Sequence, residues 1–505
     1  MSRIIGIDLG TSNSCAAYTD EKGKVHLVPY KDGSSTIPSV FAVDDKGNEL
    51  IGHEAKRQWQ LNPKNTVYAS KRLIGRNYKS DVVDTMSAVV AYAMKESEAE
   101  NEVLISVAGK DFRMSEIASR ILEKVRGVAA DYLEEPVEQA VVTVPAYFTD
   151  RQRQAVKDAG DLIGLEVLRI INEPTAAALA YGVGRSLNEK VIIYDLGGGT
   201  FDVSLIEIRD RVFEVKATGG DIFLGGLDFD NALIRYVLEG FKEKHGVDLS
   251  GDPVAMQRIK DLAERTKIDL SAREKVPFSV PFVTMTAQGM PLNIELEISR
   301  ELFQQLTQGL IDRSIGVIEQ VLSDAGLTAA DIDEVMLVGG QSRMPLIHQR
   351  LTDFFGKPPS KAVHPDEAVA IGAAQYGHSL VDDTNLRIQL LDVIPMAIGL
   401  EAAGGRFHKV FDRNAPIPNA KAIMGTTSFD GQASLAMRIF QGDAPDAISN
   451  EMLGDFLFEG IRPGPAGSVH VEVTFDINVE GILTMSARDP QTGKEMTTTV
   501  RVRQN

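Results

Sequence analysis

The sequence predicts an α/β domain built from two similar halves, followed by a smaller all-β domain. Two segments of one design, IIGIDLGTSNSCAAYTD at 4–20 and VIIYDLGGGTFDVSLIEI at 191–208, suggest an internal duplication. Each is an apolar run that ends in Asp-Leu-Gly and continues through small or hydroxylic residues into a second alternating run, as in a β-hairpin. Long amphipathic stretches lie between and after them, and short alternating runs take over after about residue 380.

The amphipathic stretches are the expected helices of the first domain. Residues 115–135 and 300–322 carry apolar side chains at helical spacing. In RIINEPTAAALAYG, the Glu-Pro pair ends an apolar strand and begins a helix of small residues. Strands and helices therefore interleave, which is the pattern of an α/β fold.

The C-terminal part reads as antiparallel β structure. Its alternating runs are separated by Gly, Pro, Asn and Asp; they span 421–429, 433–442, 468–478 and 481–489. The connecting segment TNLRIQLLDVIP is apolar at Leu390 and Leu391, although linkers are usually polar. It is either a first strand of the β domain or a linker that docks into a groove in one functional state.

Composition limits the class of protein. The 505 residues suggest about three domains, and 43% hydrophobic residues suffice for buried cores. With 53 Lys+Arg against 71 Asp+Glu, the net charge of −18 disfavours binding to nucleic acid or membrane surfaces. The single cysteine, Cys15, excludes an intrachain disulfide, and no signal peptide pattern or long apolar run occurs. We expect a soluble, cytoplasmic protein.

The turns of the two hairpins are candidate phosphate-binding loops. Small residues let backbone amides converge on an anion, at Gly10, Thr11, Ser12 and Asn13 and again at Gly197, Gly198, Gly199 and Thr200. Such a loop is weak evidence alone, but a facing pair fits a polyphosphate. Asp8 and Asp195 at the strand ends, with Asp202 beyond the second loop, fit its magnesium ion, which takes few protein ligands.

Other candidate positions are ambiguous by themselves. Glu173 is either a functional acid or a helix N-terminal residue favoured by the helix dipole. Lys71 alone would pass as a surface lysine. Gly340 and Arg343 follow an apolar strand at the start of a helix, where a ligand could bind.

The order of the motifs resembles the seventy-kilodalton heat-shock chaperone family, in its bacterial DnaK type. The matching segments are GIDLGTSNSC, KRLIG, VVTVPAYF, INEPTAAALAYG, YDLGGGTFDVS, LGGLDFD, VGGQSRMP and HPDEAVAIGAA. The resemblance implies an actin-like (ribonuclease H-like, duplicated) ATPase domain over residues 1–383. It further implies an interdomain linker at 384–394 and a β-sandwich peptide-binding domain at 395–505.

The resemblance also implies roles for residues of the first domain. Asp8, Asp195 and Asp202 would surround Mg²⁺, and the two glycine loops would hold the phosphates of ATP or ADP. Lys71 would orient the attacking water, with Glu173 and Thr200 helping to place it. The residues that would flank the adenosine are Glu264, Lys267, Ser271, Gly340, Arg343 and Asp366. The resemblance also allows K⁺ in the site.

For the coupling of the two domains, the resemblance points to a switch and to the linker. Pro145 and Arg153 match the family's switch between the nucleotide and peptide sites. Leu390, Leu391 and Asp392 match its linker.

The implied peptide groove departs from the family pattern. It would be lined by Leu400, Leu435 and Met437, with Ala403 and Ser428 arching over the peptide. Ala403 is small where a longer apolar side chain is usual, Gly425 falls where an aromatic is common, and Leu435 replaces a usual valine. The family normally continues into a helical lid after the last strand, but the given residues stop at EMTTTVRVRQN, so we expect no lid within them. Unfolded apolar peptides, a J-domain co-chaperone and a GrpE-type exchange factor are the implied partners.

Two other classes share the duplicated fold. A small-molecule kinase of the sugar or glycerol type would need a catalytic carboxylate between the lobes. An actin-type filament protein would use the fold structurally. Neither accounts for the apolar linker or for residues 393–505, so we predict an ATP-dependent chaperone and keep the kinase as the alternative.

Overall fold

The first half of the α/β domain, lobe I (residues 3–187), is built on a sheet that starts with the predicted hairpin. The computed structural model describes residues 3–97, 101–286, 288–381 and 388–499. Strand β1 (Ile4–Asp8) pairs antiparallel with β2 (Asn13–Thr19) and parallel with β11 (Gln139–Val144). The sheet is completed by β12 (Glu166–Asn172), β3 (Val25–Leu27) and β4 (Thr36–Pro38).

Lobe II (residues 188–381) repeats this arrangement. Strands β13 (Asn188–Leu196) and β14 (Phe201–Arg209) form the second hairpin, and β18 (Glu334–Val338) runs parallel to β13 as β11 does to β1. Strand β15 (Val212–Asp221) adds to the free side of β14. The shared topology confirms the duplication that the two Asp-Leu-Gly segments predict.

The helices form where the apolar periodicity predicts them. The stretch 115–135 lies in α3 (Met114–Leu133), whose buried face includes Ile117, Ile121 and Val125. The stretch 300–322 lies in α8 (Arg300–Asp324). The remaining helices are α1 (His53–Gln58), α2 (Asp81–Ser87), α4 (Asp150–Asp161), α5 (Glu173–Gly182), α6 (Gly226–His245), α7 (Pro253–Ala272), α9 (Pro345–Phe355) and α10 (Ala368–Val381).

Helices α5 and α10 cross between the lobes, each packed on the other half's sheet. Helix α5 follows the sheet of lobe I but packs on β13 and β14, whereas α10 packs on β1 and β2. At the crossing, a Cβ on Gly372 would lie 1.7 Å from the carbonyl oxygen of Ala176. The two helices therefore touch backbone to backbone, which only small residues permit.

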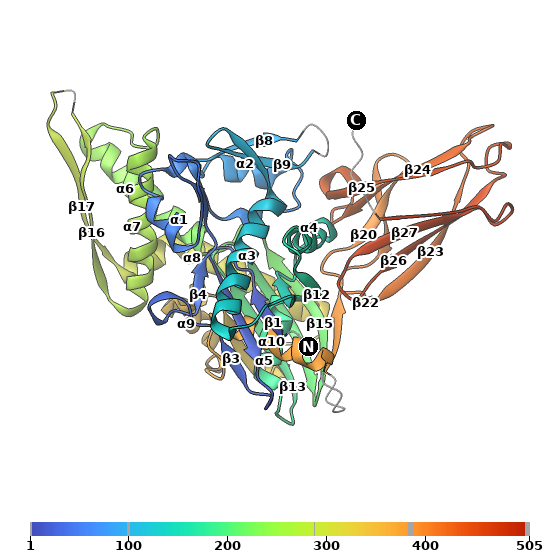
Figure 1. Ribbon diagram of the computed structural model, residues 1–505, viewed down its shortest axis with the longest axis horizontal. Coiled ribbons are helices and arrows are strands. Elements are labelled where there is room, and N and C mark those ends of the chain that lie inside the picture. The colour runs from blue at the N-terminus through green and yellow to red at the C-terminus, as the bar shows by residue number, and fades with distance from the viewer. Residues whose placement is uncertain (1–2, 98–100, 287, 382–387, 500–505) are drawn as a thin grey trace.

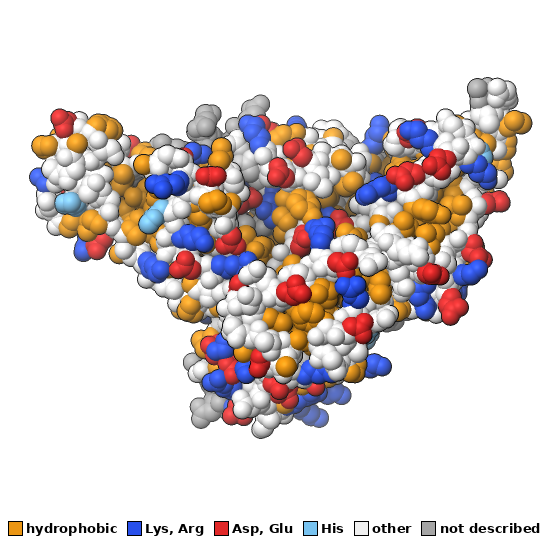
Figure 2. Space-filling view, turned by 180° about the vertical axis from the view of Figure 1, so that it is seen from behind, with side chains coloured by type: hydrophobic (Ala, Val, Ile, Leu, Met, Phe, Trp, Pro, Cys, Tyr) orange, Lys and Arg blue, Asp and Glu red, His pale blue; other side chains and the backbone are white. Residues whose placement is uncertain are grey.

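Each lobe carries an outer part beyond its main sheet. In lobe I it comprises β5 (Phe41–Val43), β6 (Glu49–Ile51), β7 (Thr66–Val67), β8 (Ala93–Glu96), β9 (Val103–Val107) and β10 (Lys110–Arg113). In lobe II the long hairpin of β16 (Lys275–Met285) and β17 (Pro291–Ser299) packs on α7 and reaches outward as an arm (Figure 1). This arm exposes Phe282, Met285 and Met290. On the face shown in Figure 2, acidic and basic side chains are interspersed.

The C-terminal part is a sandwich of two antiparallel sheets. One contains β20 (Ile398–Ala402), β21 (Arg406–Phe411), β24 (Ser434–Gln441) and β25 (Glu451–Glu459). The other contains β23 (Asn419–Thr426), β26 (His470–Ile477), β27 (Leu483–Arg488) and β28 (Glu495–Thr499). Their inward side chains share one apolar core that includes Phe411, Phe456 and Phe475, so the predicted all-β domain is present.

A single strand joins the two domains. Strand β19 (Gln389–Val393) pairs parallel with the edge of β15 in lobe II, and its end pairs with β22 (Pro416–Ile417) of the β part. The connecting segment is therefore docked on lobe II rather than free. The predicted boundary at 383–384 lies outside the described residues.

Candidate functional site

A cleft of about 850 Å³ opens between the lobes, at the ends of β1 and β13. Nearly all residues predicted for the nucleotide, its metal and catalysis line it: Asp8, Gly10, Thr11, Ser12, Asn13, Lys71, Glu173, Asp195, Gly197, Gly198, Thr200, Glu264, Lys267, Ser271, Gly340, Arg343 and Asp366. Gly199 and Asp202 stand directly behind this lining. The cleft has the size of a small-molecule site and brings together segments from all parts of the α/β domain.

The two glycine loops face each other across the cleft. A Cβ on Gly198 would lie 2.0 Å from Ser12 Oγ, and one on Gly199 would lie 2.4 Å from Thr11 Cγ2. Side chains at these positions would therefore collide with the opposite loop. This contact explains why glycines stand there and supports the prediction of a facing pair.

Four carboxylates gather around the loops. Burial, followed by repulsion from Glu173, raises the pKa of Asp8 to about 7 and the pKa of Asp202 to about 8. Burial also raises the pKa of Asp195 well above its ordinary value, with further repulsion from Glu173 and Asp202. Lys71 lowers the pKa of all three, and Arg153 also lowers the pKa of Asp202. One ammonium cannot balance four carboxylates, so the site has a deficit of positive charge.

This deficit fits a hydrated magnesium ion. Within the described residues, no three His, Cys, Asp or Glu side chains converge closely enough to ligate one metal directly. Magnesium usually keeps several waters and takes few protein ligands, so carboxylates that surround it through water suit it. Asp202 is fixed for such a role because it accepts a hydrogen bond of 3.1 Å from the backbone N–H of Tyr147.

Lys71 and Glu173 form a buried ion pair beside these carboxylates. Lys71 stands on a one-turn 3₁₀ helix, η3 (Ser70–Arg72), and Glu173 is the first residue of α5. Both side chains are less than a tenth exposed. Lys71 is therefore no surface lysine, and the helix start at Glu173 places its carboxylate in the cleft.

The predicted adenosine side of the cleft carries charged pairs. Lys267 contacts Asp230 at 3.0 Å, and Arg343 is paired with Asp366. Further lining residues that the sequence reasoning missed are Thr36, Gly226, Gln341, His364 and Val369. Gln341, His364 and Val369 lie inside the segments VGGQSRMP and HPDEAVAIGAA, so only proximity to those motifs could have indicated them.

Arg153 lies at the junction of the two domains. Its buried guanidinium donates to Asn172 Oδ1 at 2.7 Å, to the carbonyls of Ala146 and Phe148, and to the Glu480 carbonyl of the β domain. The loop that starts at the buried Pro145 is thus tied to Arg153. Asn172 directly precedes Glu173, so this junction lies one residue from the cleft.

Two further carboxylates hold the β domain against lobe I. Glu480, 4% exposed, pairs with Lys157 and accepts from the N–H of Ile170 at 3.2 Å. Asp150 accepts from the N–H of Leu483 at 2.6 Å, while burial raises the pKa of its carboxyl to about 6. The sequence reasoning missed both residues, because their partners lie about 300 positions away along the chain.

The three predicted linker residues have different surroundings. Asp392 accepts from Asn172 Nδ2 at 2.8 Å, and Leu390 packs against the apolar cluster beneath lobe II's sheet. Leu391, in contrast, is 45% exposed. Alternation along a strand explains the difference, since neighbouring side chains point to opposite faces.

The predicted peptide groove lies on one sheet of the sandwich. Leu400, Leu435 and Met437 are partly buried against the sandwich core, and a Cβ on Gly425 would lie 3.3 Å from Leu435 Cδ2. Ala403 and Ser428 are exposed in turns that follow β20 and β23. The side chains of Leu435 and Met437 thus lie against the space that a side chain at position 425 would fill.

Comparison with known proteins agrees with this geometry. The family model for the Hsp70 protein matches residues 4–505. The chain is 45% identical to the chaperone protein DnaK of Buchnera aphidicola subsp. Schizaphis graminum, in an alignment that covers 99% of this chain and 79% of that protein. The matched range contains both glycine loops, the linker strand and the sandwich, and the chain therefore belongs to the Hsp70 family.

Proposed function

We propose that the cleft binds ATP with Mg²⁺ and that the residues gathered there hydrolyse it to control a peptide groove on the β domain. As a member of the Hsp70 family, the chain is an ATP-dependent chaperone and an ATPase. The proposal concerns which residues carry these activities. The observation that supports it most is the facing pair of glycine loops above a buried cluster with one lysine and four carboxylates.

In this proposal the backbone amides of the two loops bind the phosphates. Asp8, Asp195 and Asp202 would hold Mg²⁺, and the ion would supply charge that offsets the phosphates. Lys71 stabilises negative charge on the transferred phosphoryl group, a contribution that depends on a fixed cation in a site shielded from solvent. Glu173 fixes the ammonium by ion pairing, and Thr200 helps to place the attacking water.

The coupling of the two sites follows from their shared contacts. Asn172 contacts both Arg153 and Asp392, and it directly precedes Glu173. A movement of Glu173 with the phosphates therefore acts on the residues that hold the linker and the β domain. A ligand can shift such an arrangement only as far as its affinity differs between the docked and free states.

The groove at Leu400, Leu435 and Met437 is proposed to bind extended apolar segments of unfolded proteins, by main-chain hydrogen bonds and a side-chain pocket. We further propose a J-domain protein and a GrpE-type exchange factor as partners, K⁺ as a further ion in the cleft, and the cytoplasm as the location. Within the described residues, no helix is long and apolar enough to cross a membrane.

The decisive experiment measures ATP turnover with and without a short apolar peptide. A chaperone ATPase accelerates when peptide occupies its groove, whereas a kinase of the same fold responds to a small phosphate acceptor instead. Acceleration that disappears in Leu435→Asp would support both proposed sites. Turnover that ignores peptide would contradict their coupling.

A further inference from the structure

Arg72 directly follows the catalytic lysine and reaches the opposite lobe. Both residues lie on the single turn η3, which starts after Ala69 in a left-handed backbone conformation (φ 54°). Lys71 pairs with Glu173 inside lobe I, whereas the guanidinium of Arg72, 5% exposed, points into lobe II. One short turn therefore supplies two cations to two different lobes.

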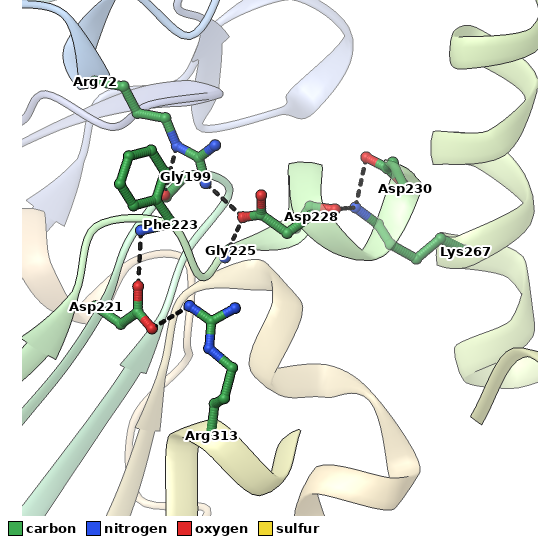
Figure 3. A network of polar contacts seen from close by, with 10 residues as sticks. Arg72, Gly199, Asp221, Phe223, Gly225, Asp228, Asp230, Lys267 and Arg313 are labelled. Carbon is green, nitrogen blue, oxygen red and sulfur yellow. Dashed lines mark hydrogen bonds and ion pairs between the residues drawn. The ribbon is translucent and has the colours of Figure 1, made fainter. Parts of the chain in front are cut away.

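In lobe II, Arg72 binds the second glycine loop and the helix behind it (Figure 3). Its Nε donates to the carbonyl oxygen of Gly199 at 2.7 Å, and its Nη2 pairs with Asp228 at 2.5 Å. The same Asp228 oxygen accepts from the N–H of Gly225 at 2.8 Å. Arg72 thus joins the loop and the start of α6 through one planar group.

The hydrogen bond from Arg72 to Gly199 is one of three that hold successive carbonyls of the second glycine loop. The carbonyl of Gly197 accepts from the N–H of Gly226, and the carbonyl of Gly198 accepts from the N–H of Leu227, both at 2.9 Å. In a trans peptide, the N–H of the next residue points away from the carbonyl. Three carbonyls held on the α6 and Arg72 side therefore turn the N–H groups of Gly198, Gly199 and Thr200 the other way.

The first glycine loop is held differently. The carbonyl of Gly10 accepts from Ser39 Oγ at 2.7 Å, and the carbonyl of Ser12 accepts from the N–H of Ser39 at 2.9 Å. Both donors belong to the same lobe as the loop. Among the described residues, a side chain from across the cleft holds a carbonyl of the second loop but none of the first, and that carbonyl precedes Thr200.

We infer that Arg72 is a positioning residue for hydrolysis: it fixes the Gly199–Thr200 peptide relative to Lys71 when the lobes are closed. This inference rests on the proposed roles of Lys71 and Thr200. Because the two partners of Arg72 belong to lobe II, opening the cleft would separate Thr200 from Lys71 and break these bonds together. Arg72 thereby makes the reactive geometry depend on closure.

Two other polar contacts between the lobes lack this feature. Lys56 contacts Glu264 at 3.2 Å, and Gln60 contacts Asp261 at 2.8 Å, at the outer rim of the cleft. They hold the lobes together without touching the glycine loop. Loss of Arg72 therefore leaves other closing contacts in place while it frees the Gly199 carbonyl.

The test is single-turnover ATP hydrolysis by the full chain, together with the dissociation constant for ATP. For Arg72→Ala we expect a rate reduced by about tenfold or more, with affinity changed less than about threefold, because misplaced reacting groups reduce kcat rather than binding. Guanidinium at millimolar concentration should restore part of the rate. The rate of Arg72→Lys should lie between the rates of wild type and Arg72→Ala, since a single ammonium cannot reproduce both directed bonds.

Two further variants sharpen the result. Asp228→Asn keeps an acceptor for Gly225 but loses the ion pair, so its effect should not add to that of Arg72→Ala. Arg313→Ala is the matched control, because Arg313 pairs with Asp221 in the same region without contacting the loop (Figure 3). Its rate should stay within twofold of wild type.

The possible results distinguish a failure of the inference about Arg72 from a failure of the proposed catalytic site. Equal losses of affinity and rate in Arg72→Ala, or no loss of either, would overturn the positioning role. If Lys71→Ala also hydrolysed ATP normally, the proposed catalytic site itself would be wrong. Normal hydrolysis by Arg72→Ala beside an inactive Lys71→Ala would leave the site intact and refute only the role of Arg72.

Discussion

At the scale of single residues, the main feature of the cleft is a buried cluster of charged side chains. Lys71 would be an ordinary exposed lysine by its sequence neighbours, yet it is buried among carboxylates whose pKa values burial and mutual repulsion raise. Such a cluster is poorly stable without added cations, which suits a site that receives Mg²⁺ with a nucleotide. In the proposed mechanism, the buried lysine supplies the fixed charge that phosphoryl transfer uses.

Lys71→Ala should bind ATP but hydrolyse it about 10²-fold or more slowly, because a preorganised charge near the reacting group is lost. Single-turnover rates after rapid mixing measure the chemical step. Lys79→Ala, which removes a lysine that is 72% exposed, is the control and should behave as wild type. A Lys71→Ala rate within a few-fold of wild type would remove Lys71 from the mechanism.

At the scale of elements, β19 makes the linker part of lobe II's sheet. Its pairing with β15 explains how an apolar linker avoids exposing all its side chains. Alternation along the strand then gives Leu390 and Leu391 different surroundings, which the sequence did not distinguish.

The two leucines should consequently differ in function. Leu390→Asp places a charge against an apolar cluster, so it should weaken docking and abolish most of the acceleration of peptide release by ATP. Leu391→Asp should have a smaller effect, since Leu391 is 45% exposed. Stopped-flow release of a fluorescent peptide compares the two. Equal effects would contradict the predicted difference between the two leucines.

Strand β24 provides a second matched pair of variants. Leu435→Asp should reduce peptide affinity at least tenfold, because the groove would have to bury an unpaired charge. Ala436→Asp, on the exposed face of the same strand, is the control. Fluorescence anisotropy with the ADP-bound protein measures both. Unchanged binding by Leu435→Asp would place the groove on other residues.

At the scale of the whole molecule, the β domain docks on lobe I through buried charges and backbone groups. Asp150, Arg153 and Glu480 each bond to a group of the other domain. Polar contacts of this kind keep the interface separable, since each partner can return to water when the domains part.

Docking should depend on pH through Asp150. Burial raises its pKa from the ordinary 3.8 to about 6, so the docked state binds a proton more tightly than an undocked state in which Asp150 is exposed. The cost of burying the ionised carboxyl is present above pH 6 and disappears as pH falls. The docked-to-undocked ratio should therefore rise about fourfold from pH 7 to 5.5.

Energy transfer between dyes on lobe I and the β domain would measure this ratio. Asp150→Asn should show a weaker pH dependence. Some dependence should remain, because burial also raises the pKa of Asp392. Weaker docking at low pH, or an identical dependence in the variant, would contradict the argument.

The sequence predicted most of the elements, but not the contacts between segments that lie far apart along the chain. The repeated hairpins predicted both lobes and the facing loops. The spacing of apolar residues, together with the turn residues between runs, predicted helices such as α3 and α8 and strands such as β24. Contacts such as Asp150 with Leu483 join residues 333 positions apart, and no local pattern encodes them. The burial of Lys71 likewise arises only when segments from both lobes enclose it.

We expect the crossing of α5 and α10 to act as a pivot between the lobes. Backbone touches backbone at Ala176 and Gly372, so no side chains need to repack when one lobe turns against the other. A rotation at the crossing would then separate the two lobes at the Lys56–Glu264 pair, which joins them at the rim of the cleft. Gly372→Ala would place a methyl group against the Ala176 carbonyl at the crossing itself, and it should slow nucleotide exchange, as release of a fluorescent nucleotide would measure.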